Sequence, residues 1–192
     1  MSNDYLAKVS FLVVDDQEFI RQLVRQVLGV IGAREVVDCA DGERAWEEFK
    51  LTPADVVILD WKMSPVDGIE LTNLIRKDPD SPNPYVPIIM MTAYSERARV
   101  LKARDAGVSE FVIKPMSAKT LFNRIETVIS RPRSFVRVGT YFGPDRRRAN
   151  KDFPGAERRG SGVASPPPPA AEGDAQAQID ELLHADEDEN RG

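Results

Sequence analysis

The sequence predicts an α/β fold in which helices cover both faces of a parallel sheet. Short runs of Val, Ile and Leu alternate with longer segments whose apolar residues recur every three or four positions, from residue 9 to residue 130. The first pattern is typical of strands and the second of amphipathic helices. Residues 56–59 are four consecutive apolar residues, which suits a strand buried on both faces. Five strand–helix units in succession indicate a doubly wound sheet.

Each predicted strand is a short, mainly apolar segment that ends in, or is followed by, polar or turn-forming residues. Such runs are too short for a typical helix, and they are rich in residues that favour strands. The predicted strands are residues 9–14, 35–40, 56–60, 88–91 and 110–113.

Each predicted helix shows an amphipathic pattern, and several have recognisable ends. Asp41-Gly42 forms a turn before the second helix, Ser95 and Ser117 can cap the fourth and fifth, and Gly32 and Gly107 suit helix ends. Prolines at four positions make the connection between residues 79 and 87 extended. The predicted helices are residues 19–31, a segment carrying Ala45, Trp46 and Phe49, residues 68–77, a segment between Ser95 and Gly107, and a segment with apolar residues at 121–129.

The composition fits one folded domain with an extension. The single cysteine, Cys39, excludes a disulfide framework and fits a reducing cytosol. The N-terminus lacks the basic and apolar regions of a signal peptide, and no run approaches the ~18 apolar residues that span a bilayer. We therefore expect a cytoplasmic protein without membrane insertion.

Polar residues that could bind a ligand or take part in chemistry end or follow four of the five predicted strands. Carboxyl ends of parallel strands share one edge of a sheet, where open α/β sheets bind ligands. We therefore expect these side chains to converge in one crevice. They are Asp15 and Asp16, Asp60, Thr92, and Lys114.

This set of side chains suits a phosphate and a divalent cation. Neighbouring carboxylates repel each other unless a cation balances them, and Mg²⁺ binds one or two carboxylates while keeping water and phosphate ligands. Lys114 suits phosphate as a mobile point charge, Thr92 can donate its hydroxyl, and Ala93 leaves room for a bulky group. Taken singly, each residue is as well explained by a helix cap, a loop or a solvated surface. Their joint arrival at one edge favours a site.

Residues 9–130 resemble a response regulator receiver domain, the family of the bacterial chemotaxis regulator. The resemblance implies a flavodoxin-like (βα)5 sheet of order 2-1-3-4-5. The motifs that carry it are Val14-Asp15-Asp16, Asp60 with Met63 and Asp67-Gly68, Met91-Thr92-Ala93, and Phe111-Val112-Ile113-Lys114-Pro115.

The resemblance also implies residue roles. Asp60 is the phosphoacceptor for a histidine kinase phosphohistidine, and the protein is a signalling module, not an enzyme. Mg²⁺ is held by Asp16, Asp60 and the backbone carbonyl of Lys62, with Asp15 acting through water. Thr92 and Lys114 contact the phosphoryl oxygens, and Ala93 lies beside them. Phe111 turns inward on activation, and the Lys114–Pro115 bond is cis.

The chain departs from the family pattern after the acceptor. The family usually has proline four residues past the acceptor, whereas Ser64 holds that position here and Pro65 follows it. Lys62 and Tyr94 lie where the family tunes phosphoryl lifetime. The bulk of Tyr94 predicts a long-lived aspartyl phosphate, because it hinders an attacking water.

The resemblance implies protein partners at two stages. The expected phosphoryl donor is a sensor histidine kinase or a histidine phosphotransfer protein. A downstream target is expected on the face made by the fourth helix, fifth strand and fifth helix, and a homodimer on activation remains an alternative.

Four regions are predicted from composition: a receiver domain at 6–131, a basic aromatic-containing extension at 132–160, a Pro/Ala-rich linker at 161–174 and an acidic tail at 175–192. The net charge of −5 divides into −3 for residues 1–131, +5 for 132–160 and −7 for 161–192. The last three regions are expected to be largely disordered, without a second globular domain.

The extension admits two interpretations. Its arginines and aromatics could contact nucleic acid. Alternatively Phe135, Tyr141 and Phe142 pack back on the receiver while the arginines stay solvated, which we favour because the whole protein is acidic.

The tail contains a short candidate partner-binding motif, which resembles peptides that grip activated receivers. A frayed helical end without a partner is the alternative. The motif residues are Gln178, Ile179, Asp180, Leu182 and Leu183.

Together these features predict a single-domain response regulator that signals by phosphorylation-dependent protein binding. Two alternatives stay open: a phosphorelay intermediate that passes its phosphoryl group to a histidine phosphotransfer protein, and a nucleic-acid-binding regulator that uses the arginine-rich extension.

Overall fold

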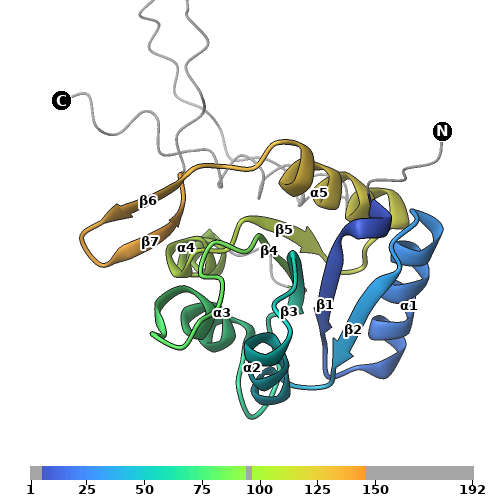
Figure 1. The fold of residues 1–192 in the computed structure, drawn as a ribbon, viewed down its shortest axis with the longest axis horizontal. Helices are drawn as coiled ribbons and strands as arrows, with labels where there is room; N and C mark the ends of the chain where they lie inside the picture. The colour runs from blue at the N-terminus through green and yellow to red at the C-terminus, as the bar shows by residue number, and fades with distance from the viewer. Residues whose placement is uncertain (1–5, 94–96, 146–192) are drawn as a thin grey trace, which may run out of the picture.

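A computed structural model describes residues 6–93 and 97–145 of the chain (Figure 1). Its centre is a five-stranded parallel sheet of order β2-β1-β3-β4-β5. This is the order that the resemblance to receiver domains implied. The strands are β1 (Ser10–Val14), β2 (Glu35–Cys39), β3 (Val56–Asp60), β4 (Ile88–Thr92) and β5 (Glu110–Ile113).

Five helices connect and flank the strands, each within two residues of its predicted position where bounds were predicted. Asp41 and Ser117 accept hydrogen bonds from backbone N–H groups at the starts of α2 and α5, and Asp67 forms a capping box with Glu70 at the start of α3. Leu6–Lys8 adds a short 3₁₀ turn that the sequence did not predict. The helices are α1 (Glu18–Val30), α2 (Gly42–Leu51), α3 (Gly68–Lys77), α4 (Arg97–Ala106) and α5 (Ala118–Ser130).

Two apolar layers lie on opposite faces of the sheet. Along β1, Leu12 and Val14 belong to the cluster shared with α2, α3 and α4, whereas Phe11 and Val13 belong to the cluster shared with α1 and α5. This alternation is the period of two that a strand imposes on its side chains. Figure 1 shows the same division, with α1 and α5 on one side of the sheet and α2, α3 and α4 on the other. β3 and β4 are buried along their whole length, as their uninterrupted apolar runs predicted.

A β-hairpin that the sequence did not predict follows α5. Its strands β6 (Phe135–Val138) and β7 (Tyr141–Pro144) pair in antiparallel fashion, and β7 contacts α4 and α3. Phe142 is only 6% exposed, and its ring lies edge-on to Tyr85 and tilted against Phe135. This arrangement agrees with the interpretation that the aromatics of the extension pack on the receiver.

The hairpin covers a buried arginine on α3. Arg76 is 2% exposed, and its guanidinium donates hydrogen bonds to the carbonyl oxygens of Gly107 at 3.1 Å and Pro84 at 2.8 Å. The ring of Phe135 lies 5.0 Å from the guanidinium carbon, within cation–π range. Burial lowers the pKa of Arg76 to about 9, which still leaves the guanidinium charged at neutral pH.

Some expectations concern residues outside those described. They are Tyr94, the cap at Ser95, and everything from residue 146 onward, including the linker and the motif at Gln178, Ile179, Asp180, Leu182 and Leu183. No helix in the described ranges has the length and apolar character needed to cross a membrane.

Replacing Gly143 with alanine is expected to destabilise the protein. A Cβ there would lie 2.6 Å from Tyr141 Oη and 2.9 Å from Gly107 Cα, so the hairpin and the end of α4 must separate. Overpacking of this kind costs about 1–3 kcal/mol in the free energy of unfolding. Urea unfolding followed by circular dichroism measures the change.

Gly29→Ala is the matched control. Gly29 lies in α1 with nothing within 4 Å of an added Cβ, so alanine should raise the free energy of unfolding. The gain is expected to reach at most about 1 kcal/mol. Equal stability of Gly143→Ala and the unmodified protein would mean that the hairpin does not pack as described.

Candidate functional site

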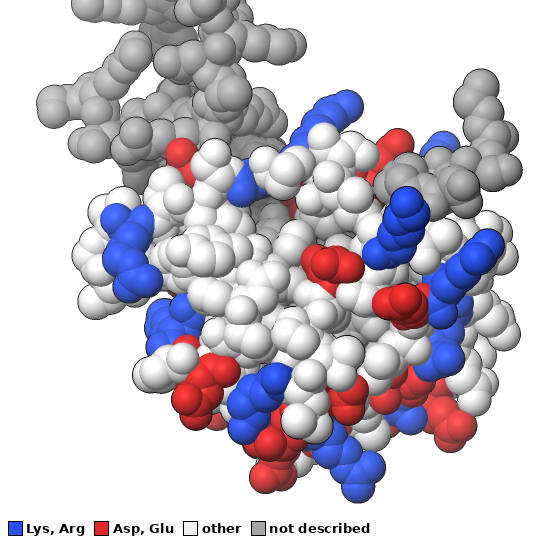
Figure 2. Space-filling view, in the orientation of Figure 1, with Lys and Arg blue, Asp and Glu red and all other residues white. Residues whose placement is uncertain are grey.

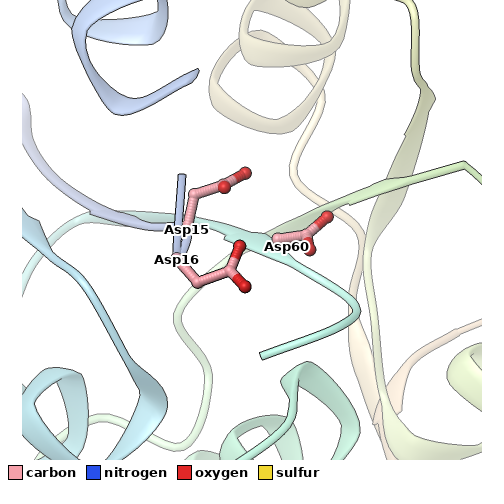
Figure 3. A group of neighbouring side chains, drawn as sticks. All are labelled: Asp15, Asp16 and Asp60. Atoms are coloured by element: carbon pink, nitrogen blue, oxygen red, sulfur yellow. The ribbon is translucent and has the colours of Figure 1, made fainter. Parts of the chain in front are cut away.

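Three carboxylates lie together at the carboxyl edge of the sheet. Asp15 and Asp16 follow the end of β1, and Asp60 is the last residue of the neighbouring strand β3. Each contributes one oxygen to a group in which all the oxygens lie within 4.8 Å of one another (Figure 3). Asp15 and Asp60 are buried, whereas Asp16 is exposed. The fold therefore produces the convergence of these three residues that parallel strand ends predict.

Lys114, which directly follows β5, joins this group. Its ammonium nitrogen lies 2.7 Å from Asp15 Oδ2 and 2.8 Å from Asp60 Oδ1. The side chain of Lys114 is only 16% exposed, so these ion pairs are partly shielded from water. The backbone N–H of Lys114 donates to the carbonyl oxygen of Thr92 at 2.8 Å, which fixes the end of β5 against the end of β4.

Burial and charge act in opposite directions on the ionisation of this group. Burial raises the pKa of Asp15 above its ordinary value, and the hydrogen bond from Lys114 opposes this only in part. For Lys114, burial lowers the pKa, but hydrogen bonds to Asp15 and Asp60 and the charges of both carboxylates outweigh it, so the pKa is raised. Lys114 therefore stays charged at neutral pH. One ammonium faces three acidic groups, a set that favours binding of a further cation.

Backbone groups fix the two buried carboxylates. The N–H of Gln17 donates to Asp15 Oδ1 at 2.9 Å, and the N–H of Lys62 donates to Asp60 Oδ2 at 3.0 Å. Gly68 packs directly on the end of β3, where an added Cβ would lie 2.3 Å from the carbonyl oxygen of Asp60. A glycine is thus required where α3 begins, because the chain there passes so close to the end of β3.

A pocket of about 260 Å³ opens beside the carboxylates. Ala93 lines it, as predicted from its place after β4, whereas Thr92 and Phe111 are fully buried. The peptide bonds before Pro65 and Pro115 are both cis. The residues that line the pocket are Asp16, Gln17, Asp60, Trp61, Lys62, Ala93 and Lys114.

Two of these lining residues were not singled out from the sequence. Gln17 was overlooked because a residue before a helix has no distinctive chemistry, although its position directly after the Asp pair was a usable signal. Trp61 follows Asp60 and is 8% exposed, so it lies at the site as a natural fluorophore.

Comparisons with known proteins agree on one family. A family model described as the response regulator receiver domain matches residues 11–126. The chain is 32% identical over 122 residues to the chemotaxis protein CheY1 of Helicobacter pylori, a match that covers 63% of this chain and 97% of that protein. It is 40% identical over 128 residues to "Probable transcriptional regulator ycf27" of Guillardia theta, covering 67% of this chain but 48% of that protein.

Solved structures give the same result for the fold. The chemotaxis protein CheY4 of Vibrio cholerae superposes with a TM-score of 0.58 at 28% identity, covering 62% of this chain and 98% of that one. The receiver domain of the Francisella response regulator 1452 superposes with a TM-score of 0.59 at 26% identity, covering 65% of this chain and 98% of that one.

Asp16→Asn is expected to stabilise the protein in the absence of divalent cations. The change removes one of three like charges, which is worth about 1 kcal/mol in the free energy of unfolding for neighbouring charges in contact with water. The gain should be present at neutral pH and lost as the pH falls, because protonation removes the repulsion in both proteins. Since the pKa of Asp15 is raised, the loss should begin above the ordinary pKa of 3.8.

Urea unfolding in EDTA at pH 7 and at about pH 3 measures this difference. Glu126→Gln is the control, since Glu126 is an exposed carboxylate on α5 outside the cluster. Its effect should stay within about 0.5 kcal/mol, which is usual for surface substitutions. A gain for Glu126→Gln equal to that for Asp16→Asn would attribute the effect to net charge instead of the cluster.

Proposed function

The chain belongs to the response regulator receiver domain family, and from this premise we propose that Asp60 accepts a phosphoryl group from the phosphohistidine of a sensor histidine kinase or histidine phosphotransfer protein. The observation that carries the proposal is the contact of the Lys114 ammonium with both Asp15 and Asp60 beside an open pocket. A carboxylate held by an ammonium at the mouth of a pocket can meet a phosphoryl group whose charge that ammonium then shares. In this proposal the protein is a signalling module and its output is protein binding.

The transfer itself needs little from the protein beyond positioning and charge. An oxygen of Asp60 attacks the phosphorus, the P–N bond of phosphohistidine breaks, and its electron pair leaves with the imidazole. The N–H of Lys62 donates a 3.0 Å hydrogen bond to Asp60 Oδ2, which keeps the orientation of the carboxylate fixed. Lys114 and the Thr92 hydroxyl contact the incoming phosphoryl oxygens, while Ala93 leaves space for them.

The acidic group fits a hard divalent cation such as Mg²⁺. Oxygen ligands from one or two carboxylates suit that ion, and the exposed side chain of Asp16 lies on the solvent side of the group. In the proposed arrangement Asp16, Asp60 and the backbone carbonyl of Lys62 hold the ion, and Asp15 acts through water. The ion supplies positive charge that offsets the negative charge brought in with the phosphoryl group.

Phosphorylation would shift charge at the point where several elements meet. The aspartyl phosphate carries roughly two negative charges where the carboxylate carried one. Lys114 and Thr92 are drawn toward it, and both lie at strand ends that lead directly into α5 and α4. The proposed result is a change on the α4-β5-α5 face, which a downstream protein recognises.

The described part of the molecule offers no separate support for nucleic-acid binding. Arg137 lies over the Phe142 ring with its guanidinium carbon 4.7 Å from the centroid, and Arg133 pairs with Glu110 at 3.1 Å. On the face that Figure 2 draws, basic side chains are interspersed with acidic ones, without one broad basic patch.

Asp60→Asn is expected to abolish phosphorylation. Phosphoramidate is a suitable donor, because its P–N bond mimics that of phosphohistidine. With Mg²⁺ present, the unmodified protein should gain one phosphoryl group by intact-mass spectrometry, and the variant should gain none. EDTA should also prevent the reaction, since it removes the cation.

Asp80→Asn is the matched control, because Asp80 is an exposed carboxylate in the connection between α3 and β4. It should be phosphorylated like the unmodified protein. Phosphorylation of Asp60→Asn at an unchanged level would overturn the acceptor assignment. Rapid loss of the phosphoryl group to an added histidine phosphotransfer protein would favour the phosphorelay alternative.

A further inference from the structure

A cluster of charged side chains lies next to the acidic group but outside it. Arg21 and Arg25 on α1 both pair with Asp38 on β2: Arg21 Nε lies 3.1 Å from Asp38 Oδ2, and Arg25 Nη1 contacts Asp38 Oδ1. Figure 1 shows α1 lying beside β2, and the two elements are in contact. The two arginines differ in burial, with the Arg21 side chain 14% exposed and that of Arg25 47% exposed.

The arginines also differ in what else they contact. Arg21 Nη1 donates to the carbonyl oxygen of Asp15 at 2.7 Å. That oxygen belongs to the peptide that joins Asp15 to Asp16. Arg25 Nη1 instead donates to the carbonyl oxygen of Val36 at 3.1 Å, away from the acidic group.

Asp15 is fixed at every polar atom, but Asp16 is not. The Asp15 N–H donates to the Cys39 carbonyl at 3.3 Å, and its carboxylate accepts from Gln17 and Lys114. No hydrogen bond or ion pair to the Asp16 carboxylate is formed within the described ranges. The direction in which the Asp16 side chain points therefore depends on the orientation of the Asp15–Asp16 peptide. Arg21 donates a hydrogen bond to the carbonyl oxygen of that peptide.

We propose that Arg21 is a positioning residue for the metal site: it fixes the Asp15–Asp16 peptide so that Asp16 faces Asp60, and Asp38 holds Arg21 in that orientation. The inference rests on the proposed Mg²⁺ site. Partners of this kind, which orient a ligand without touching the ion, typically change metal affinity 10–100-fold when removed.

Geometry and simple electrostatics predict opposite effects of removing Arg21. Loss of a nearby positive charge on its own would strengthen binding of a cation, because like charges repel. Loss of the hydrogen bond to the Asp15 carbonyl would weaken binding, because Asp16 would sample orientations that do not face Asp60. The sign of the change in affinity therefore separates positioning from charge.

The test is a Mg²⁺ titration of the full chain followed by Trp61 fluorescence. Trp46 and Trp61 are the two tryptophans of the chain, so all variants carry Trp46→Phe to leave the one that lines the site. Arg21→Ala is expected to raise the dissociation constant for Mg²⁺ about tenfold. Arg25→Ala removes the same charge from the same carboxylate, and it should change affinity by less than about twofold in physiological salt, where exposed charges are screened.

Arg21→Lys provides a second variant that keeps the charge and can reach one of the two partners. It should recover part of the lost affinity, and it keeps the test decisive if Arg21→Ala does not fold. Unchanged or tighter Mg²⁺ binding by Arg21→Ala, or by Arg21→Lys in that case, would overturn the positioning role alone. Absence of Mg²⁺ binding by the Trp46→Phe protein with Arg21 intact would overturn the proposed metal site together with this inference.

Discussion

The structure of the site depends on one ammonium shared by two buried carboxylates. Lys114 lies 99 residues from Asp15 in sequence, yet its nitrogen is 2.7 Å from Asp15 Oδ2 and 2.8 Å from Asp60 Oδ1. Removing charges from water is costly, and it is tolerated only where such close pairing compensates. Because Asp16 adds a third acidic group beside one ammonium, the local charge is not balanced by the protein alone. The site therefore carries excess negative charge that a bound cation can balance.

The same contact explains how a change at Asp60 can affect distant elements. The Lys114 backbone bonds to Thr92, which ends β4 just before α4, and α5 begins four residues past Lys114. The described apolar contacts of α4 come from small side chains, with Val100, Ala103 and Ala106 buried, whereas α5 buries Leu121, Ile125 and Val128. The described part of α4 therefore buries smaller apolar side chains than α5 does, so apolar burial contributes less to holding α4 than to holding α5.

Most of the strands and helices, and the convergence of the site residues, could be predicted from the sequence, because the signals for them were local. The apolar run before Asp60 fixed β3, Gly68 marked the start of α3, and parallel strand ends must share an edge. The hairpin at 135–144 was not predicted, because alternating aromatics and arginines are compatible with more than one local structure. Its position also depends on contacts with α3 and α4, which the sequence does not reveal. The role inferred for Arg21 could not be predicted either, because it depends on how α1 lies against β2, a tertiary distance that no spacing encodes.

The guanidinium of Arg76 is buried beneath the hairpin with no carboxylate partner among the described residues. Arg76 donates to the carbonyl oxygen of Gly107, which directly follows the last residue of α4. The carboxyl end of a helix carries partial negative charge from its unpaired carbonyl groups, so it can replace a carboxylate as the partner of a cation. The Phe135 ring adds a second attractive surface at 5.0 Å. Arg76 on α3 thus contacts both the end of α4 and the hairpin, and these contacts help to hold the strands past α5 against the rest of the fold.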